Sequence, residues 1–282
     1  MFQYAFYKRL SRKNRPVYIT YERAINEIHT GYSLSHVFRL KPRKAPEILR
    51  VLAGTQKPPF KQIRNLLIKA GLFHHYKPDF GVYIPMNPKP GMNIYHGYWQ
   101  SEKYFQDIEA EIRRDFEFTE IREEKNLNLL KIMKDHTSIS IHVRRGDYLQ
   151  CGLAFSDSAM RAYYQNAMEY LCGRVKNAIF LIFSNDINWC KDNILPPPQA
   201  ENLIFVDWNT DQESFRDMQL MSLCDHNIIT NSTFSWWGAW LNQNKDKIVI
   251  TPETWFPANS EVGQKEKWKD LLPESWIKIK NS

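Results

Sequence analysis

The chain has few cysteines and no long apolar run, and both absences restrict what it can be. Its 282 residues contain no apolar segment long enough to span a membrane and no segment with the pattern of a signal peptide. The four cysteines show no C-x-x-C spacing, which predicts reduced thiols rather than disulfides. They are Cys151, Cys172, Cys190 and Cys224. We therefore expect a soluble cytoplasmic protein.

Carboxylate and histidine pairs of the kind that hold metal ions are also missing. The chain has no Asp-x-Asp motif, and its eight histidines show no paired ligand spacing. A Mg²⁺ or Mn²⁺ ion held by such a motif often neutralises a leaving diphosphate, but cationic side chains and a helix end can do the same. The sequence therefore predicts no metal ligands and no metal cofactor.

The composition indicates a folded protein with a sizeable core. Hydrophobic residues make up 43% of the chain and aromatic residues 14%, which excludes a disordered chain. The net charge of +7 is compatible with an anionic small molecule, a membrane surface or nucleic acid. We interpret this charge as spread along the chain, so that it alone favours none of the three. Without a basic stripe, we expect no nucleic acid partner.

The length suits two domains, and the rhythm of the sequence changes near residue 136. Before that point, apolar spacing and capping residues predict helices at residues 1–10, 21–29, 46–52, 60–70, 101–116 and 121–135. Residues 16–20 are a short strand candidate, and residues 93–100 form an aromatic strand and turn after a Pro-rich loop at 83–91.

From residue 137 the chain alternates between strands and helices. Strands are predicted at 139–143, 178–183, 202–206, 227–230 and, last, 247–251. The helices between them are predicted at 158–175, 187–194, 213–224 and 234–241. This alternation predicts an α/β fold with a parallel sheet and right-handed crossovers.

Polar side chains follow several of these strands at the point where each strand ends. Because the carboxyl ends of parallel strands meet at one edge of a sheet, we expect these groups to lie close together and form a site. They are His142, Arg144, Arg145 and Asp147 after the first strand, Ser184, Asn185 and Asp186 after the second, Asp207, Trp208 and Asn209 after the third, and Asn231, Ser232 and Thr233 after the fourth.

Two of these stretches suit a diphosphate. The guanidiniums of Arg144 and Arg145 match phosphate geometry, although Arg144 and Asp147 could instead form an ordinary surface ion pair. Ser232 or Thr233 can cap the following helix, whose first-turn amides and dipole favour an anion. The alternative for that stretch is a plain cap before a Trp-rich core helix.

Asp186 has two alternative uses. Its carboxylate could accept two hydrogen bonds from a base such as guanine. It could equally cap the helix that begins at Ile187.

Taken together, several stretches of the chain resemble the α-1,2-fucosyltransferases, an inverting, glycosyltransferase family 11-like group of bacterial and animal enzymes that uses GDP-fucose. The order and spacing of these stretches are more specific than any one of them. They are residues 142–148 (HVRRGDY), 183–191 (FSNDINWCK), 206–209 (VDWN), 217–222 (DMQLMS) and 231–242 (NSTFSWWGAWLN), with residues 1–6 (MFQYAF) and 97–105 (GYWQSEKYF) near the start.

The resemblance implies a GT-B-like fold, in which two Rossmann-like domains hold the active site in the cleft between them. Residues 1–135 would form the acceptor-side N-terminal domain and residues 136–282 the GDP-fucose-binding domain. Family members usually begin with a strand and a Gly-Gly-Leu-Gly-Asn-Gln loop before Met-Phe-Gln-Tyr-Ala, whereas this chain starts at Met1. We therefore expect the first domain to be truncated and to lack its usual first strand.

The resemblance also implies roles for the polar strand ends. Arg144 would bind the β-phosphate, His142 and Asp186 would lie at the nucleoside, and the start of the last helix would line the pyrophosphate. The complete expected donor site consists of His142, Arg144, Arg145, Ser184, Asp186, Asn231, Ser232, Thr233 and Phe234.

The implied reaction is a metal-independent single displacement that moves L-fucose to the 2-hydroxyl of a terminal β-galactoside. Arg144 would stabilise the leaving diphosphate, and Asp147 is our candidate for accepting the proton of the acceptor hydroxyl, with orientation of Arg144 or Arg145 as its alternative role. Two other functions remain open: an α-1,6- or O-fucosyltransferase, and a non-catalytic nucleotide-sugar or glycan-binding protein. We expect a galactose-terminated, lipid-linked acceptor and peripheral contact with the inner membrane of a bacterium.

Overall fold

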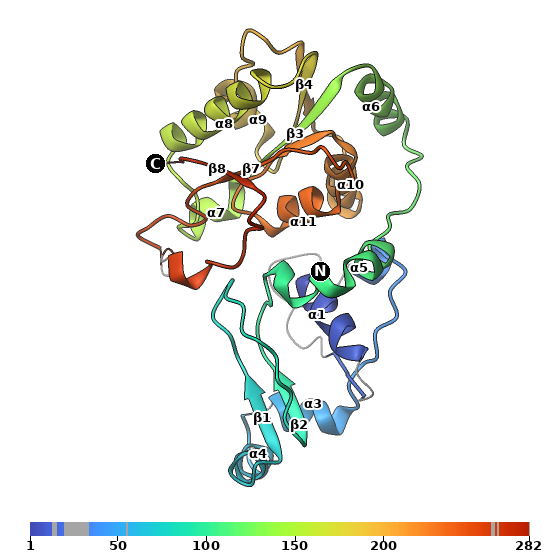
Figure 1. Ribbon diagram of the computed structural model, residues 1–282, viewed down its shortest axis with the longest axis vertical. Helices are drawn as coiled ribbons and strands as arrows, with labels where there is room; N and C mark the ends of the chain where they lie inside the picture. The colour runs from blue at the N-terminus through green and yellow to red at the C-terminus, as the bar shows by residue number, and fades with distance from the viewer. Residues whose placement is uncertain (13–15, 20–33, 55, 261–262, 264, 282) are drawn as a thin grey trace. The chain divides into compact units, whose positions relative to one another are not determined.

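The computed structural model of the chain describes residues 1–12, 16–19, 34–54, 56–260, 263 and 265–281 (Figure 1). The chain forms two compact units, which we call unit 1 and unit 2. Unit 1 consists of Met1–Glu117 and Glu266–Pro273, and unit 2 of Phe118–Lys265 and Glu274–Ser282. The helix predicted at residues 21–29 lies outside the described residues.

Unit 2 is built on one parallel sheet, which confirms the predicted α/β architecture. The spatial order of its strands is β5-β4-β3-β6-β7-β8, and every neighbouring pair is parallel. Counted within unit 2, this is the 3-2-1-4-5-6 order of a Rossmann fold. The strands are β3 (Thr137–Val143), β4 (Ala178–Ser184), β5 (Asn202–Val206), β6 (His226–Ile228), β7 (Val249–Pro252) and β8 (Ile277–Ile279).

The prediction that the last strand lies at residues 247–251 is wrong, because β8 adds a further strand beyond β7. Its three residues, Ile277, Lys278 and Ile279, are too few for alternation to stand out from the sequence. Pairing with β7 at the sheet edge makes this short segment a strand.

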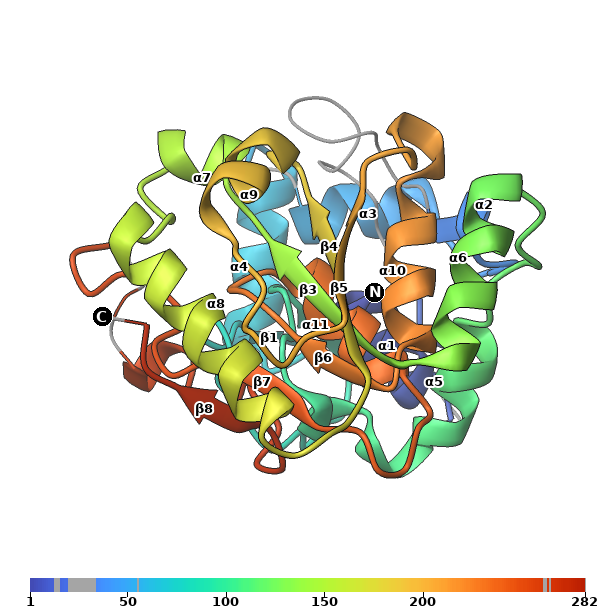
Figure 2. The same cartoon turned by 90° about the horizontal axis from the view of Figure 1, so that it is seen from above.

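Helices cover both faces of the central strands (Figure 2). On one face, Ile139 and Ile141 of β3 pack with apolar side chains of α8 and α9. On the other face, Leu181 of β4 packs with those of α6 and α10. The helices of unit 2 are α6 (Glu124–Asp135), α7 (Gly146–Gln150), α8 (Asp157–Cys172), α9 (Ile187–Asn193), η3 (Asp211–Glu213), α10 (Phe215–Leu223) and α11 (Thr233–Leu241). Burial on both faces explains the uninterrupted apolar sequence of β4.

Unit 1 contains short helices and a two-stranded parallel sheet of β1 and β2. Its elements are α1 (Phe2–Ser11), α2 (Leu34–Val37), α3 (Glu47–Gly54), α4 (Phe60–Lys69), β1 (Phe73–Tyr76), β2 (Met92–Tyr95), η1 (Glu102–Tyr104), η2 (Gln106–Ile108) and α5 (Glu109–Asp115). At the strand candidate 16–20, the described residues form a single bridge between Ile19 and Lys44.

The helix predicted at residues 101–116 is correct only in its second half. Ser101 caps the segment as expected, but two 3-10 turns precede α5. Tyr104 and Phe105 are both fully buried. Phe105, with φ −149° and ψ 7°, lies between the two turns and interrupts the helix.

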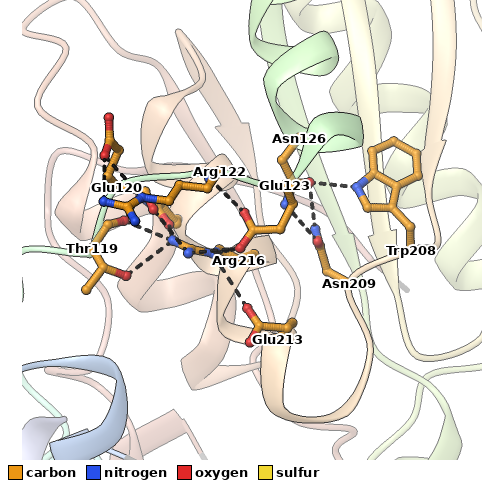
Figure 3. A network of polar contacts seen from close by, with 10 residues as sticks. Thr119, Glu120, Arg122, Glu123, Asn126, Trp208, Asn209, Glu213 and Arg216 are labelled. Carbon is orange, nitrogen blue, oxygen red and sulfur yellow. Dashed lines mark hydrogen bonds and ion pairs between the residues drawn. The ribbon is translucent and has the colours of Figure 1, made fainter.

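A buried arginine fixes the irregular segment that begins unit 2 (Figure 3). Arg216 of α10 is 7% exposed and pairs with Glu123 at 3.0 Å. Its Nη1 and Nη2 atoms donate to the carbonyl oxygens of Thr119 and Glu120 at 2.9 and 3.1 Å. These bonds satisfy backbone groups that have no regular partner and attach the segment before α6 to α10.

A second polar cluster joins α6, the end of β5 and α10 (Figure 3). Nε1 of Trp208 donates to Oδ1 of Asn126 at 2.6 Å, and Nδ2 of Asn209 donates to Oδ1 of Asp217 at 2.8 Å. Burial raises the pKa of Asp217 from its ordinary 3.8 to about 7, while the bond from Asn209 opposes this rise.

Asp217→Asn should remove a pH dependence of stability. Because the folded-state pKa lies above the unfolded value, the free energy of unfolding contributed by Asp217 falls as pH rises from about 4 to about 7. Asn cannot ionise, so the variant should match the wild type near pH 4 and exceed it by about 2–4 kcal/mol at pH 8. Urea denaturation across this range measures the difference. Asp192→Asn, at an exposed position, is the control, and parallel pH curves for Asp217→Asn and the wild type would contradict the assignment.

Candidate functional site

Most of the predicted site residues lie at the carboxyl ends of β3, β4 and β6. The neighbouring strands β3 and β6 are where the order of the sheet reverses, because the chain runs from β3 to β4 and β5 on one side and returns through β6 to β7 and β8 on the other. The loops that follow β3 and β6 therefore diverge, which makes this edge the usual ligand position in such sheets.

Two adjacent tyrosines of α8 fix the ends of these strands. The hydroxyl of Tyr164 donates to the carbonyl oxygen of His142 at 3.0 Å, and that of Tyr163 to the carbonyl oxygen of Ile229 at 2.6 Å. Both phenols are buried, so their hydrogen bonds are shielded from water. The sequence analysis did not predict these two hydrogen bonds. The pair of tyrosines on the apolar face of a predicted helix could have indicated them.

His142 and Phe234 bring the two predicted motifs into contact. Their rings lie 5.5 Å apart, between the end of β3 and the first turn of α11. His142 is 6% exposed, and its Nδ1 atom has no hydrogen-bond partner among the described residues. Burial, with a smaller effect of Arg144, lowers the pKa of His142 to about 3. The imidazole is therefore neutral at physiological pH and has a ring nitrogen to offer to a ligand.

Arg144 and Asp147 form the ion pair that was the alternative reading of this stretch. Nη2 of Arg144 donates to Oδ2 of Asp147 at 3.0 Å. The guanidinium also lies 5.5 Å from the centre of the Tyr148 ring. Both charged side chains are partly exposed, at 26% and 34%, so this pair remains accessible from solvent.

Two hydrogen bonds join the loop after β3 to the loop after β6. The hydroxyl of Tyr148 donates to the carbonyl oxygen of Asn231 at 3.1 Å. The Nδ2 atom of Asn231 donates to the carbonyl oxygen of Leu153 at 2.9 Å. Asn231 is thus a buried connector of the two loops, and these bonds fix the Arg144 segment relative to the start of α11.

The start of α11 is a helix cap followed by a Trp-rich core helix, and the anion site at this turn stays a prediction. Ser232 caps the helix by accepting from the backbone N–H of Phe234 at 3.3 Å, and Thr233 begins the first turn. The rest is a core helix, in which Trp236 and Trp237 are buried. At Gly238 a Cβ atom would lie 3.0 Å from that of Met221, so glycine allows α11 to pack closely on α10. This packing fixes the direction of the N-terminus of α11.

Arg145 has different surroundings from Arg144. It is 7% exposed, its Nε donates to Asp186 at 3.0 Å and its Nη1 pairs with Asp157. The guanidinium lies over the ring of Trp189 at 4.3 Å from its centre. The two carboxylates raise the pKa of Arg145 against the effect of burial, and they keep its charge inside the structure.

Asp186 makes the helix cap that was one of its two predicted uses. Its Oδ1 atom accepts from the backbone N–H of Trp189 at 3.2 Å while its Oδ2 accepts from Arg145. Ser184 accepts from the backbone N–H of Asp186 at 2.9 Å. Hydrogen bonds thus link Arg145, which is next to Arg144 in the sequence, with Asp186 and Ser184. Sequence reasoning did not find the carboxylate of Asp157.

The third predicted strand end is not part of this cluster. Asp207 pairs with Lys191 at 3.4 Å, and Trp208 and Asn209 contact the polar cluster around Asn126. Within the described ranges, no group of three His, Cys, Asp or Glu side chains could hold a metal ion. No described helix is long and apolar enough to cross a membrane.

Gly146→Ala should disturb the Arg144 segment more than a change at a comparable glycine. Its φ is +30°, and a Cβ atom would lie 2.3 Å from Nδ2 of Asn185, whose Oδ1 is held by the backbone N–H of Arg145. Backbone strain and this collision together should lower the free energy of unfolding by about 2–4 kcal/mol. Gly152→Ala is the matched control, since Gly152 has φ +66° but open space around it, and should cost about 1 kcal/mol. Equal losses in urea denaturation would show that the contact with Asn185 is unimportant.

Comparison with known proteins identifies the family of the chain. The sequence profile of glycosyl transferase family 11 matches residues 49–280. An α-1,2-colitosyltransferase of Escherichia coli is 34% identical over 190 residues, which cover 65% of this chain and 61% of the relative. The O-antigen biosynthesis glycosyltransferase WbnK of Escherichia coli is 31% identical over 251 residues, or 85% of this chain and 78% of the relative.

The animal enzymes match over a shorter stretch. The galactoside α-(1,2)-fucosyltransferase 1 of Bos taurus is 32% identical over 192 residues, which cover 65% of this chain and 52% of that enzyme. The chain thus spans about half the length of this animal relative. These matches confirm the resemblance to α-1,2-fucosyltransferases seen in the sequence. The chain belongs to glycosyl transferase family 11.

Proposed function

We propose that this glycosyltransferase moves L-fucose from GDP-fucose to the 2-hydroxyl of a terminal β-galactoside, with inversion and without a metal ion. One observation carries the proposal: the partly exposed Arg144 is fixed beside the N-terminus of α11 by the bond between Tyr148 and Asn231. Members of the family transfer sugars from nucleotide-sugar donors to glycan acceptors. A diphosphate suits this position because a planar cation and first-turn amides can bind it together.

In this proposal the donor diphosphate lies between Arg144 and the first turn of α11. The acceptor's 2-hydroxyl oxygen forms a bond to the anomeric carbon of fucose as the bond from that carbon to the β-phosphate oxygen breaks. The electron pair of the broken bond leaves with GDP, and the proton of the hydroxyl passes to solvent water. Arg144 and the helix N-terminus stabilise the growing charge on that oxygen. The neutral His142 contributes a hydrogen bond rather than a second cation, since its pKa of about 3 keeps it uncharged.

The loops after β3 and β4 are held together by Arg145, Asp186 and Ser184. These residues position the site and add no net charge to it. The cation of Arg145 is already compensated by Asp157 and Asp186. We therefore assign Arg144 as the phosphate-binding arginine of the pair and Arg145 as a positioning residue. Asn231 and Ser232 hold the start of α11, and Thr233 and Phe234 are placed to line the ligand.

Asp147 is best placed to orient Arg144. The two side chains share an ion pair of 2.9 Å, which holds the guanidinium in one position. Of the two roles that the sequence left open for Asp147, this contact supports orientation over proton transfer from the acceptor.

We propose a GT-B arrangement in which the parallel sheet of unit 2 binds the donor. Residues 136–282 would bind GDP-fucose, and residues 1–135 would contribute the acceptor side of a cleft. The single-displacement mechanism needs both partners at once, so we propose that the acceptor reaches the donor from the N-terminal part of the chain.

Colitose is a second candidate for the transferred sugar. The observation that favours it is the 34% identity with a relative named α-1,2-colitosyltransferase. The proposed Arg144 and α11 site would bind the diphosphate of either donor, so the two candidates differ only in contacts to the sugar. Competition between the two nucleotide sugars in a transfer assay distinguishes them.

Arg144→Ala should lower transfer from GDP-fucose to lactose by about 10²–10³-fold, because it removes the cation that stabilises the leaving diphosphate. It should weaken the binding of GDP about tenfold in calorimetry, because a charge-assisted contact is lost.

Both measurements are made with EDTA present, and activity should persist there in the wild type. Arg174→Ala, an exposed arginine at the far end of α8, is the control. Undiminished transfer by Arg144→Ala would refute the site, and GDP binding without any transfer in the wild type would favour a non-catalytic binding protein. Linkage analysis of the product separates 2-fucosylation from the α-1,6 alternative.

Asp147→Asn should lower turnover and GDP affinity by similar factors, since a loosened Arg144 binds both the ground state and the transition state less well. The neutral amide can still accept a hydrogen bond from Arg144, so the loss should be smaller than that in Arg144→Ala. Calorimetry and steady-state kinetics on the same preparations provide the two values. A large loss of turnover with unchanged GDP affinity would instead make Asp147 the base that takes the acceptor's proton.

A further inference from the structure

Helix α4 carries an apolar stripe on its exposed side. Ile63, Leu66, Leu67 and Ala70 follow the i, i+3, i+4, i+7 spacing of one helix face, and we call these four residues the α4 stripe. Ile63 is 42% exposed and Leu66 is 67% exposed. An amphipathic helix normally buries its apolar face, so an exposed stripe indicates a surface used for binding.

An arginine, rather than the apolar stripe, packs α4 onto the rest of unit 1. Arg64 is the one buried residue of α4 as the structure describes it. Its Nη1 atom donates to the carbonyl oxygens of Leu52 and Ala53 at 3.2 Å each, at the C-terminal end of α3. This contact satisfies carbonyl groups at the end of α3 and turns the α4 stripe away from that neighbour. Helix α3 buries no side chain at its described positions, and Ile48 on it is 56% exposed.

Cations surround these helices, and this corrects our interpretation that the positive charge is spread along the chain. Residues 34–78 contain 10 Lys and Arg residues but a single acidic residue, Glu47, whereas the whole chain has 38 basic and 31 acidic residues. Lys61 and Lys69 of α4 are exposed, as are Lys41 and Arg43 before α3. The segment that carries the apolar stripe is therefore also strongly basic.

We propose that α3 and α4 bind an anionic lipid bilayer. An exposed apolar stripe on a helix whose other sides carry lysines is the pattern of helices that lie in the membrane interface. In this arrangement the α4 stripe enters the boundary between headgroups and acyl chains. Lys69, beside the stripe, contacts lipid phosphates, and Lys61, on the opposite side of the helix, adds to the attraction by the anionic surface. Charge complementarity selects the bilayer as occupant, because neither a neutral apolar partner nor a soluble polyanion would use both features. The α4 stripe belongs to unit 1 and shares no residue with the Arg144 site of unit 2, so this inference does not rest on the proposed transfer reaction.

Vesicle co-sedimentation of the full chain tests the proposal. The wild type should bind vesicles of phosphatidylcholine with phosphatidylglycerol, bind pure phosphatidylcholine vesicles weakly, and dissociate at high salt. The double variant Ile63→Ser with Leu66→Ser should bind the anionic vesicles at least about tenfold more weakly, because it removes the inserted apolar surface. The double variant Lys61→Gln with Lys69→Gln should lose a similar factor.

Matched controls come from unit 2. Leu127→Ser with Leu195→Ser changes side chains of 40% and 66% exposure, close to those of Ile63 and Leu66, and should leave vesicle binding unchanged. Lys176→Gln with Lys245→Gln, at exposed positions, controls for net charge. All variants should keep wild-type circular dichroism and GDP affinity.

Three results would overturn the proposal. The first is failure of the wild type to bind anionic vesicles. The second is loss of binding in the lysine variant but not in the Ile63 and Leu66 variant, which indicates a simple polyanion surface. The third is a wild-type dimer in analytical ultracentrifugation that dissociates in the Ile63 and Leu66 variant, which indicates that the α4 stripe pairs two copies of the chain.

Discussion

The pairing of β3 with β6 is the interaction on which the proposed site depends. Ile139, Ser140 and Ile141 of β3 pair in parallel with His226, Asn227 and Ile228 of β6. This register places the loops that follow the two strands next to each other, although 83 residues separate Tyr148 from Asn231 in sequence. Buried polar contacts reinforce the pairing, since Asn227 donates to Oγ of Ser140 at 2.7 Å. The positions of Arg144 and of the α11 N-terminus both follow from it.

Two consecutive arginines at this edge, Arg144 and Arg145, differ in burial and therefore in the role that we propose for each. Arg145 points into the structure, where Asp157, Asp186 and Trp189 fix and neutralise it. Arg144 has one carboxylate partner and remains partly exposed. A ligand can compete for a partly exposed cation at modest cost, whereas removing Arg145 from its partners would leave buried charges uncompensated. The second arginine therefore provides rigidity for the first.

The sequence predicted the architecture of unit 2 well, because strand and helix periods alternate clearly there. The strand at residues 202–206 coincides with β5, and the apolar run at residues 178–183 lies within β4. It also predicted that the ends of β3 and β6 meet, because parallel strands share a carboxyl edge. Residue type alone did not distinguish Arg144 from Arg145, since the two differ in their tertiary partners, and only the family resemblance assigned the β-phosphate to Arg144. The α7 helix was missed because its five residues are too few for a periodic pattern.

Sequence-based reasoning was least successful for residues whose role depends on contacts across long distances. Asp217 gains its raised pKa from burial, which its residue type does not reveal. Asn185 was expected at a strand end, but its close approach to Gly146 follows only from the tertiary structure. A crystal structure of the protein with GDP tests the central claim most directly. The account predicts the β-phosphate within hydrogen-bond distance of the Arg144 guanidinium and of backbone N–H groups in the first turn of α11. A diphosphate bound elsewhere, with Arg144 contacting only Asp147 and Tyr148, would contradict it.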